Sequence, residues 1–439
     1  MKRYRSGLSK LRQLETWFIL LASISLILAG LAYAARTVQR HHTGGAPAHT
    51  AINIPANINN TCAIDVTVIL NRWIASVSDG TRSDHTVLNF SPNKCYRVDG
   101  TLEIANRHFL DFHGNHSTID QHYTEGAQQR AAWSVRHGSD LTWESFIIVG
   151  PHAEQQTSLG RRTPVSAYGY CASDPSRSCE WQAGWALFGV KRVVLLDNAT
   201  RNTYGDSVTI MWDYPARAID SSDIIIEGQK VYGTGRQGIS LVSGSNVVIK
   251  DGYIEGAALA PIDIEPEDAM FPVRNVTIAN NTFGQFFSSV VLAAGACTEV
   301  SEINFTGNVF AAPNISAYPN LWAASHCSTA RRGGFNIQNN SFWVEEWGND
   351  GDQVASFDNT IDNVTFANNQ VKFTCDSRTP HCGRSQAAVA TKTVVGWQIK
   401  NNDFRPFDEI WSLNGVNEGG NLTACGNISS AGANRPVAC

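Results

Sequence analysis

Eight short segments of this chain repeat one pattern, and no other feature restricts the fold as strongly. Each segment alternates apolar and polar residues, which is typical of a strand with one buried face, and then enters a turn rich in Asn or Gly. The segments begin 23 to 33 residues apart. They are RVVLLDNAT from Arg192, DIIIEGQKV from Asp223, NVVIKDGYI from Asn246, NVTIANNTF from Asn275, EINFTGNVF from Glu302, GFNIQNNSF from Gly334, NVTFANNQV from Asn363 and GWQIKNNDF from Gly396.

A unit of this length cannot bury its apolar face alone, so stacked units must share one core. The pattern predicts an all-β fold, a right-handed parallel β-helix whose successive coils lie about 4.8 Å apart. Leucine-rich repeats are the alternative solenoid, but the chain has no regular Leu-x-x-Leu-x-Leu frame. One column of the repeat is expected to form an internal ladder of stacked amides. It holds Asn198, Asn281, Asn308, Asn340, Asn369 and Asn402.

The β-helix domain is predicted to span residues 60–439, with a cap at each end. Apolar residues at Val66, Val68, Ile69, Leu70, Trp73 and Ile74 predict a short amphipathic helix within residues 65–78, which would close the first coil. The stretch after Leu413 is rich in Gly and Asn and is expected to form the C-terminal end.

The N-terminus is predicted to lie outside this domain. Residues 1–15 are basic, and residues 16–35 contain no charge, so they can span a bilayer as a helix with residues 1–15 in the cytoplasm. The alternative is a cleaved signal peptide, because Ala32-Tyr33-Ala34 fits a small-residue cleavage site. Residues 36–59 would form a linker. Both interpretations place the domain outside the cytoplasm, either anchored to the cell membrane or secreted.

The ten cysteines agree with export, since an even number outside the cytoplasm indicates disulfides. The net charge of −5 gives no reason to expect a nucleic-acid partner, and we expect a monomer. Cysteines that neighbour one another in sequence are the expected disulfide partners: Cys62 with Cys95, Cys171 with Cys179, Cys297 with Cys327, Cys375 with Cys382, and Cys425 with Cys439.

From about Asn59 to Leu413 the chain resembles the pectin-lyase-like superfamily of right-handed parallel β-helices. The eight repeats, the N-terminal helix and LDFHGNHSTI from Leu110 carry this resemblance. The superfamily includes polysaccharide lyases, glycoside hydrolases, uronan epimerases and non-catalytic surface proteins. The resemblance therefore implies the fold and a polysaccharide partner, and it leaves the activity open.

A second column of strands follows the repeats, in GDSVTIMW from Gly205, RQGISLVSG from Arg236, PIDIEPED from Pro261 and SSVVLAAG from Ser288. Alternate residues of a strand point to opposite faces, so one row should enter the core and its neighbour should point outward. The inward row is Ile210, Leu241, Ile264 and Leu292, and the outward row is Thr209, Ser240, Asp263 and Val291.

Charged and polar residues then follow one line across successive coils, where a long sugar chain could lie. We expect Asp206, Asp263 and Glu265 to be catalytic. We expect Arg236, Gln237 and Trp322 to bind the substrate, Arg236 by pairing with a uronate carboxylate and Trp322 by stacking on a sugar ring.

The spacing of these acids predicts a mechanism. The Cα atoms of Asp263 and Glu265 should lie about 6.5–7 Å apart, and Asp206 lies two coils from Asp263, about 9.5 Å. Inverting glycosidases separate their two carboxyl groups by about 6.5–9.5 Å, and retaining enzymes by about 5–5.5 Å. Both pairs therefore predict inversion, in which one acid protonates the leaving oxygen while another activates water.

The motif order is similar to that of polygalacturonase-type glycoside hydrolases, which carry Gly-Asp-Asp, Gly-His-Gly and Arg-Ile-Lys on successive coils. Here Gly205-Asp206 is followed by Ser207, Arg236-Gln237-Gly238 lacks the His, and Asp263-Ile264-Glu265 reverses the charge. Only Asp206 corresponds by residue, so the resemblance implies an activity related to pectin cleavage but distinct from it.

Two alternatives to a cofactor-free hydrolase stay open. A lyase or uronan epimerase would need a base beside calcium, and Asp263, Glu265 and Glu267 offer oxygen ligands for that ion. A non-catalytic glycan-binding protein of the cell surface would depend on Trp-lined surfaces instead of the acids.

Overall fold

The computed structural model describes residues 51–122, 131–152 and 181–311, together with shorter stretches between 154 and 178 and between 319 and 433. All of these belong to the unit Thr50–Cys439. The predicted cytoplasmic segment 1–15 and the predicted membrane or signal segment 16–35 lie outside the described residues. Within the described part, the structure contains no helix with the length and hydropathy of a membrane span.

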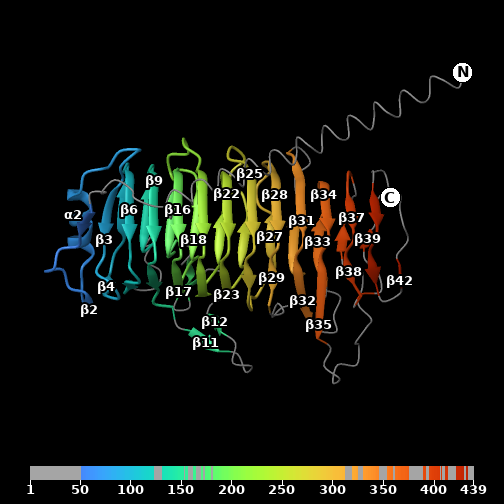
Figure 1. Ribbon diagram of the computed structural model, residues 1–439, viewed down its shortest axis with the longest axis horizontal. Coiled ribbons are helices and arrows are strands. Elements are labelled where there is room, and N and C mark those ends of the chain that lie inside the picture. The colour runs from blue at the N-terminus through green and yellow to red at the C-terminus, as the bar shows by residue number, and fades with distance from the viewer. Residues whose placement is uncertain are drawn as a thin grey trace, which may run out of the picture. The chain divides into compact units, whose positions relative to one another are not determined.

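Three parallel sheets build the domain, and strands of successive coils lie side by side along the stack (Figure 1). The first sheet has 13 strands: β1 (Ala51–Asn53), β3 (Thr86–Asn89), β6 (His108–His113), β9 (Ser139–Glu144), β16 (Lys191–Leu196), β19 (Ser222–Glu227), β22 (Gly244–Lys250), β25 (Val273–Ala279), β28 (Val300–Thr306), β31 (Arg332–Gln338), β34 (Asp362–Ala367), β37 (Gln398–Lys400) and β40 (Thr423–Cys425).

The second sheet has 14 strands, of which only the last is antiparallel to its neighbour. They are β2 (Thr61–Asp65), β4 (Cys95–Val98), β7 (Thr118–Gln121), β10 (Ile147–Val149), β17 (Ala199–Thr203), β20 (Lys230–Thr234), β23 (Tyr253–Ala257), β26 (Thr282–Phe283), β29 (Val309–Phe310), β32 (Ser341–Glu345), β35 (Gln370–Thr374), β38 (Asp403–Phe404), β41 (Ile428–Ser429) and β42 (Gly432–Ala433).

The third sheet has 11 strands: β5 (Leu102–Ala105), β8 (Trp133–Arg136), β15 (Trp185–Phe188), β18 (Val208–Met211), β21 (Ile239–Leu241), β24 (Ile262–Ile264), β27 (Val290–Ala293), β30 (Leu321–Ala324), β33 (Ala355–Asp358), β36 (Val389–Thr391) and β39 (Trp411–Leu413). Two short hairpins that the sequence does not predict stand outside the three sheets. They are β11 (Glu154–Gln156) with β12 (Arg162–Pro164), and β13 (Tyr170–Cys171) with β14 (Asp174–Ser178).

Each coil passes through the third, the first and the second sheet in turn, which makes a right-handed parallel β-helix. The eight repeats form strands of the first sheet, and the second column forms strands of the third. Ile210, Leu241 and Ile264 align across β18, β21 and β24, and all three are fully buried. The predicted inward row is therefore confirmed, and its side chains join one core that runs along the stack.

The turn after each strand of the first sheet explains the Asn column. The residue before each ladder position has a positive φ, for example 55° at Asn280 and 57° at Asn339, and Asn and Gly adopt this region most readily. The next residue points inward, and its amide bonds along the stack. Asn308 Oδ1 accepts the backbone N–H of Asn281 at 2.9 Å, and Asn308 Nδ2 donates to the carbonyl of Ile278.

The same bonds recur at Asn340, Asn369 and Asn402, and Asn427 adds a rung that the repeat alignment does not include. The ladder is interrupted between Asn198 and Asn281, where Gln229 and Gly252 occupy the two intervening positions. Gln229 Nε2 instead donates to Thr200 Oγ1 and to Ser207 Oγ. Every ladder Asn is at most 1% exposed from Asn198 to Asn402, so the predicted internal ladder is confirmed apart from this gap.

The N-terminal end of the domain starts earlier than the sequence suggests, because β1 (Ala51–Asn53) lies inside the predicted linker and pairs with β3. The single helix of the described residues, α2 (Thr67–Ser76), lies at this end of the stack (Figure 1). Leu70, Trp73 and Ile74 of α2 enter the core, as the predicted amphipathic pattern requires, whereas Val68 and Ile69 of the same pattern are exposed.

The Cys62–Cys95 disulfide forms as predicted and joins β2 to β4. Cys297 and Cys425 are also disulfide-bonded, and no described cysteine is free. The four other predicted pairs each include a residue outside the described part of the chain.

Candidate active site

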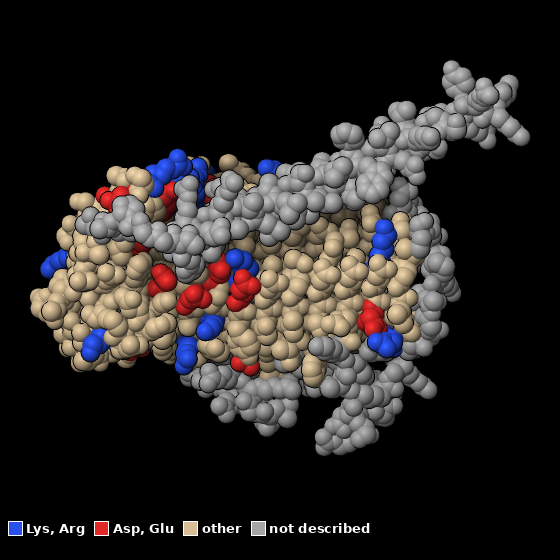
Figure 2. Space-filling model, in the orientation of Figure 1, with Lys and Arg blue, Asp and Glu red and all other residues tan. Residues whose placement is uncertain are grey.

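An open pocket lies on the outer face of the third sheet, over β18, β21 and β24. Its empty volume is about 340 Å³. Asp and Glu side chains gather near the middle of the face that Figure 2 shows. The lining consists of Trp181, Asp206, Thr209, Arg236, Ser240, Val242, Asp263, Glu265 and Glu267. Four of the six predicted site residues are therefore brought together: Asp206, Arg236, Asp263 and Glu265.

The β-helix register brings them together. Thr209 pairs with Ser240, Ser240 with Asp263, and Asp263 with Val291, so the predicted outward row is confirmed. Arg236 lies in the bend before β21, and Glu265 follows β24 directly. Outward does not mean exposed, however, because Asp263 is only 5% exposed.

Asp206 lies at the floor of the pocket and accepts three hydrogen bonds. Its Oδ2 accepts from Thr209 Oγ1 at 3.0 Å and from Ser240 Oγ at 2.6 Å, and its Oδ1 accepts the backbone N–H of Gln237 at 2.9 Å. Asp206 is 2% exposed. Each donated hydrogen favours the negative charge on Asp206, whereas burial of the carboxyl opposes that charge.

Gln237 lies beneath the pocket and does not line it. Its Nε2 donates to Asp263 Oδ2 at 2.7 Å, and its Oε1 accepts the backbone N–H of Ala260 at 2.6 Å. Both ends of the amide are thus used inside the protein, whereas the sequence assigns Gln237 to substrate binding. The structure instead makes it the group that joins Asp206 to Asp263 and fixes their orientation.

Asp263 is the acid whose protonation is most altered by its surroundings. Burial raises its pKa well above the ordinary value, and the negative charges of Glu265 and Asp206 raise it further. The guanidinium of Arg236 acts in the opposite direction. Because Asp263 Oδ2 accepts from Gln237, a proton is best held on Oδ1. A hydrogen bond with Glu265 also favours the protonated form of Asp263.

The carboxyl groups of Asp263 and Glu265 are closer than the separation that inversion would need between them. Their side chains meet in a hydrogen bond, although the two residues are two apart along the chain. Side chains at i and i+2 point to the same face, so they can lean together. Asp206 stands two coils from Asp263 in the register, and Ser240 on the intervening coil donates to it.

Acidic residues beyond the strand divide into two groups. Glu267 is exposed and lines the pocket. Asp268 is buried and forms an ion pair with Arg217, so it serves the loop rather than the pocket. Of the two, only Glu267 adds negative charge to the lining.

The two tryptophans near the pocket differ from expectation. Trp322 lies on β30 and pairs with Val291 of β27, so Trp322 is two coils from Asp263. It packs with Ala260, Val291 and Ala294 outside the pocket lining. Trp181, which the sequence does not single out, lines the pocket and stacks on Tyr214 at 5.6 Å between ring centres. Trp181 precedes its strand, so the alternation of strand residues gives no signal for it.

Thr209, Ser240 and Val242 also line the pocket without being predicted to act there. The first two stand in the outward row that the sequence does align, and their hydroxyls next to an acid could have suggested hydrogen bonds to it. Val242 has only an apolar contact to offer.

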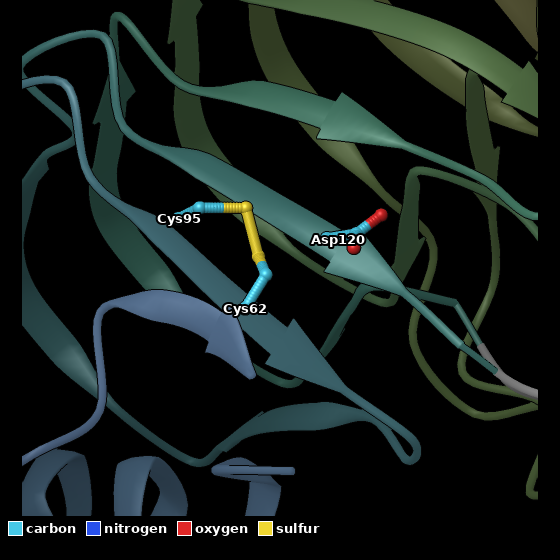
Figure 3. A group of neighbouring side chains, drawn as sticks. All are labelled: Cys62, Cys95 and Asp120. Atoms are coloured by element: carbon cyan, nitrogen blue, oxygen red, sulfur yellow. A yellow bond between two sulfur atoms is a disulfide. The ribbon is translucent and has the colours of Figure 1, made fainter. Parts of the chain in front are cut away.

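No preformed metal site appears among the pocket acids. In the described part of the chain, the one group of three potential ligands whose atoms lie within 4.8 Å of one another is Cys62, Cys95 and Asp120 (Figure 3). The two cysteines are joined in a disulfide and offer no thiolate, so this group does not fit zinc.

Comparison with known proteins gives a fold and no close relative. No family model and no curated protein matches the chain. Among solved structures it is similar to a Family 28 exopolygalacturonase of Yersinia enterocolitica, with 13% identity, a TM-score of 0.55, and coverage of 89% of this chain and 79% of that one. It is also similar to PfbA, a surface adhesin of Streptococcus pneumoniae, with 12% identity, a TM-score of 0.53, and coverage of 87% and 89%.

A third similar structure is the tailspike protein gp49 of Acinetobacter baumannii bacteriophage Fri1, a capsular polysaccharide depolymerase. It has 13% identity, a TM-score of 0.51, and coverage of 89% of this chain and 65% of that one. At such low identity these likenesses establish the fold alone. Together with the three parallel sheets, they show that the chain has the right-handed parallel β-helix fold of these proteins.

Proposed function

We propose that this protein is an extracytoplasmic polysaccharide hydrolase whose active site is the acid pocket of the third sheet. The observation that supports this most is the unequal environment of two neighbouring acids. Asp263 is buried and its pKa is raised, which favours the acid form, whereas Asp206 accepts three hydrogen bonds, which favour the carboxylate. Two carboxyl groups with opposite protonation in one pocket are what glycoside hydrolysis requires.

In the proposed reaction, Asp263 donates its proton to the glycosidic oxygen as the bond to the leaving sugar breaks. Asp206 takes a proton from the attacking water. Glu265, the hydrogen-bond partner of Asp263, returns a proton to it between turnovers. Arg236 opposes the negative charge of the pocket and lowers the pKa of Asp263.

Inversion is the expected stereochemistry. Asp206 and Asp263 lie two coils apart by strand register, about 9.5 Å between backbones, at the upper end of the separation in inverting enzymes. Asp206 is also held on both oxygens and is almost fully buried, so it cannot move to attack the sugar. Water must then be the nucleophile. Nuclear magnetic resonance of the first product anomer tests this step.

The similar structures support the coarser part of the proposal. A polygalacturonase and a capsular polysaccharide depolymerase share this fold, so a glycan is the expected substrate. The basic and apolar N-terminus, together with the cysteines, supports export, either anchored by residues 16–35 or secreted.

The test is to incubate the full chain with plant, algal and bacterial wall glycans in a strong chelator. A hydrolase of this kind should release new reducing ends without a rise in ultraviolet absorbance. An absorbing, unsaturated product that needs calcium would instead identify a lyase. Inversion of the configuration at sugar carbon C5, without chain cleavage, would identify an epimerase.

A non-catalytic role is the second candidate, because the adhesin PfbA has the same fold. In that role the protein would bind a surface glycan and release no product. Loss of binding on replacement of Trp322, with no effect of replacing the acids, would favour this candidate over the hydrolase.

A further inference from the structure

The charge of the pocket restricts which glycan it can hold. Four carboxyl groups and one guanidinium line it. Even with one proton on Asp263, the lining stays negative at neutral pH. A sugar that carries its own carboxylate would enter a field of the same sign.

Arg236 does not remove this obstacle. Its positive charge already acts on Asp263, whose pKa it lowers, and it stands among the carboxyl groups of Asp206 and Glu265. A substrate carboxylate would have to compete with these acids for one guanidinium. The sequence-based expectation that Arg236 binds a uronate is therefore disfavoured by its surroundings.

Two partly exposed tryptophans on the outer side of the third sheet each pack on a small cluster of buried apolar residues, separate from the main core. The first cluster includes Ala186, Phe188, Met211 and Val242, with Trp181 packed against it, and the second consists of Ala260, Val291 and Ala294, with Trp322 packed against it. The cations beside these clusters already have partners within the protein. Arg136 lies over the Phe188 ring and donates to the carbonyl of Tyr214, and Arg332 is buried and donates to the carbonyls of Ala294 and Ala296.

We infer that the pocket takes an uncharged polysaccharide, whose chain lies along the helix axis across both clusters. This inference rests on the proposed function and names its substrate class. The sugar bond to be cleaved lies over Asp263, and the apolar faces of neighbouring rings pack on Trp181 and Trp322. Trp322 lies two coils, about 9.5 Å, from Asp263, so sugar units are bound on both sides of the cleaved bond.

The experiment changes the charge of one polymer without changing its linkage. The polymer that the full chain cleaves is converted chemically, by oxidising primary hydroxyls to carboxylates if it is neutral or by reducing carboxylates if it is acidic. Cleavage and binding of both forms are measured at low and high salt. We expect the cleaved polymer to be neutral and its oxidised form to bind at least ten-fold more weakly, with part of the loss recovered in salt because salt screens repulsion.

The outcomes are distinct. An acidic polymer that is cleaved faster than its reduced form, with binding that weakens in salt, overturns the inference but leaves the hydrolase standing. Failure to cleave any glycan removes the hydrolase and this inference with it.

A pair of variants checks that the pocket causes the preference. Glu267→Gln removes one negative charge from the lining, so the ratio of binding to oxidised over neutral polymer should rise about three-fold. Glu302→Gln is the control, because Glu302 is exposed on β28 of the first sheet, away from the pocket lining. An equal change in both variants would mean that overall charge, not the pocket, sets the preference, and would overturn the inference.

Discussion

The coils from Asn281 to Asn427 and the coils that carry the pocket each place a row of polar groups across successive coils, but the two rows differ in composition. In the first region identical Asn side chains repeat, and each satisfies the next. In the second region the row changes at each coil, and its acids repel one another. The Asn ladder is missing at Gln229 and Gly252, in the two coils that lead into β21 and β24.

This difference teaches where to look for function in a repeat protein. Regular repetition gives the lowest-energy stack, so a departure from it has a cost that something must offset. Here the interruption of the inner ladder and the acid row on the outer face occur in the same coils. The comparison predicts that changes in one region affect stability alone and that changes in the other affect turnover alone.

The largest expected effect is a loss of turnover when a pocket acid is changed. Asp263→Asn keeps the shape of the side chain and can still accept from Gln237 Nε2, but it cannot donate an acidic proton. Turnover should fall about 10²–10⁴-fold, while the free energy of unfolding stays level or rises, because Asn cannot carry the buried negative charge that is disfavoured at Asp263. Initial rates and urea unfolding measure the two quantities.

Asp251→Asn is the matched control, since Asp251 is an exposed acid in a turn after β22 with a positive φ that Asn tolerates. It should leave both turnover and stability unchanged. If the two variants have the same turnover, Asp263 does not supply the proton.

The second-largest expected effect is a loss of stability when the Asn ladder is changed. Asn340→Leu leaves the backbone N–H of Asn308 and the carbonyl of Phe305 without their buried partner. Each unsatisfied group costs about 1–3 kcal/mol, so the free energy of unfolding should fall by at least that amount, and equivalent changes at Asn281 and Asn369 should cost about the same. Turnover per folded molecule should not change. A neutral effect at all three positions would contradict the ladder.

The pH dependence of stability sharpens the comparison. The raised pKa of Asp263 means that the folded protein keeps this proton at pH values where the unfolded chain, with a pKa of about 3.9, has lost it. The contribution of Asp263 to stability is therefore lost as pH rises from about 4 through the folded pKa. The difference in melting temperature between Asp263→Asn and the unaltered protein should grow in favour of the variant over this range.

Other groups titrate in the same range. His85, whose pKa is raised through its hydrogen bond and charge interaction with Asp111, also loses its stabilising contribution as pH rises. It is present in both proteins and cancels in the difference. A constant difference across the pH range would mean that Asp263 is not protonated in the folded state.

The smallest expected effect tests whether the ladder stabilises the fold because its amides are buried, rather than because they are amides. Asn246 belongs to an exposed row on the first sheet, where it donates to Asp223 and accepts from Asn275. Asn246→Gly fits its φ of 56° and removes both bonds. Because water replaces them, the change in the free energy of unfolding should be within about 0.5 kcal/mol. A loss as large as that of Asn340→Leu would contradict this view.

The coil register could be predicted from the sequence because a solenoid reuses one strand period. Once the eight repeats are aligned, Asp263 must fall beside Ser240 and Val291, and the structure confirms this. The side-chain contacts could not be predicted in the same way. The meeting of Asp263 with Glu265 depends on rotamers, and the burial of Gln237 depends on the path of the bend before β21.

Elements that lack an alternation of apolar and polar residues were also not predicted from the sequence. The strand β1 is three residues long, and Trp181 lies before a strand and not within it. Neither produces an alternation that can be recognised in the sequence. Their positions depend on pairing partners that are distant along the chain, such as β3 for β1.

The direction of the ladder bonds has a mechanical consequence. Every rung is bonded to the one after it, across 25 to 33 residues of chain. A force that pulls on the C-terminal side should therefore open one rung at a time, and each opening should release about 90–120 Å of extended chain. Five such bonds link Asn427 to Asn281. The coils that carry the pocket are thus shielded from tension applied at that side, as the proposed hydrolase would need while it holds a long polymer.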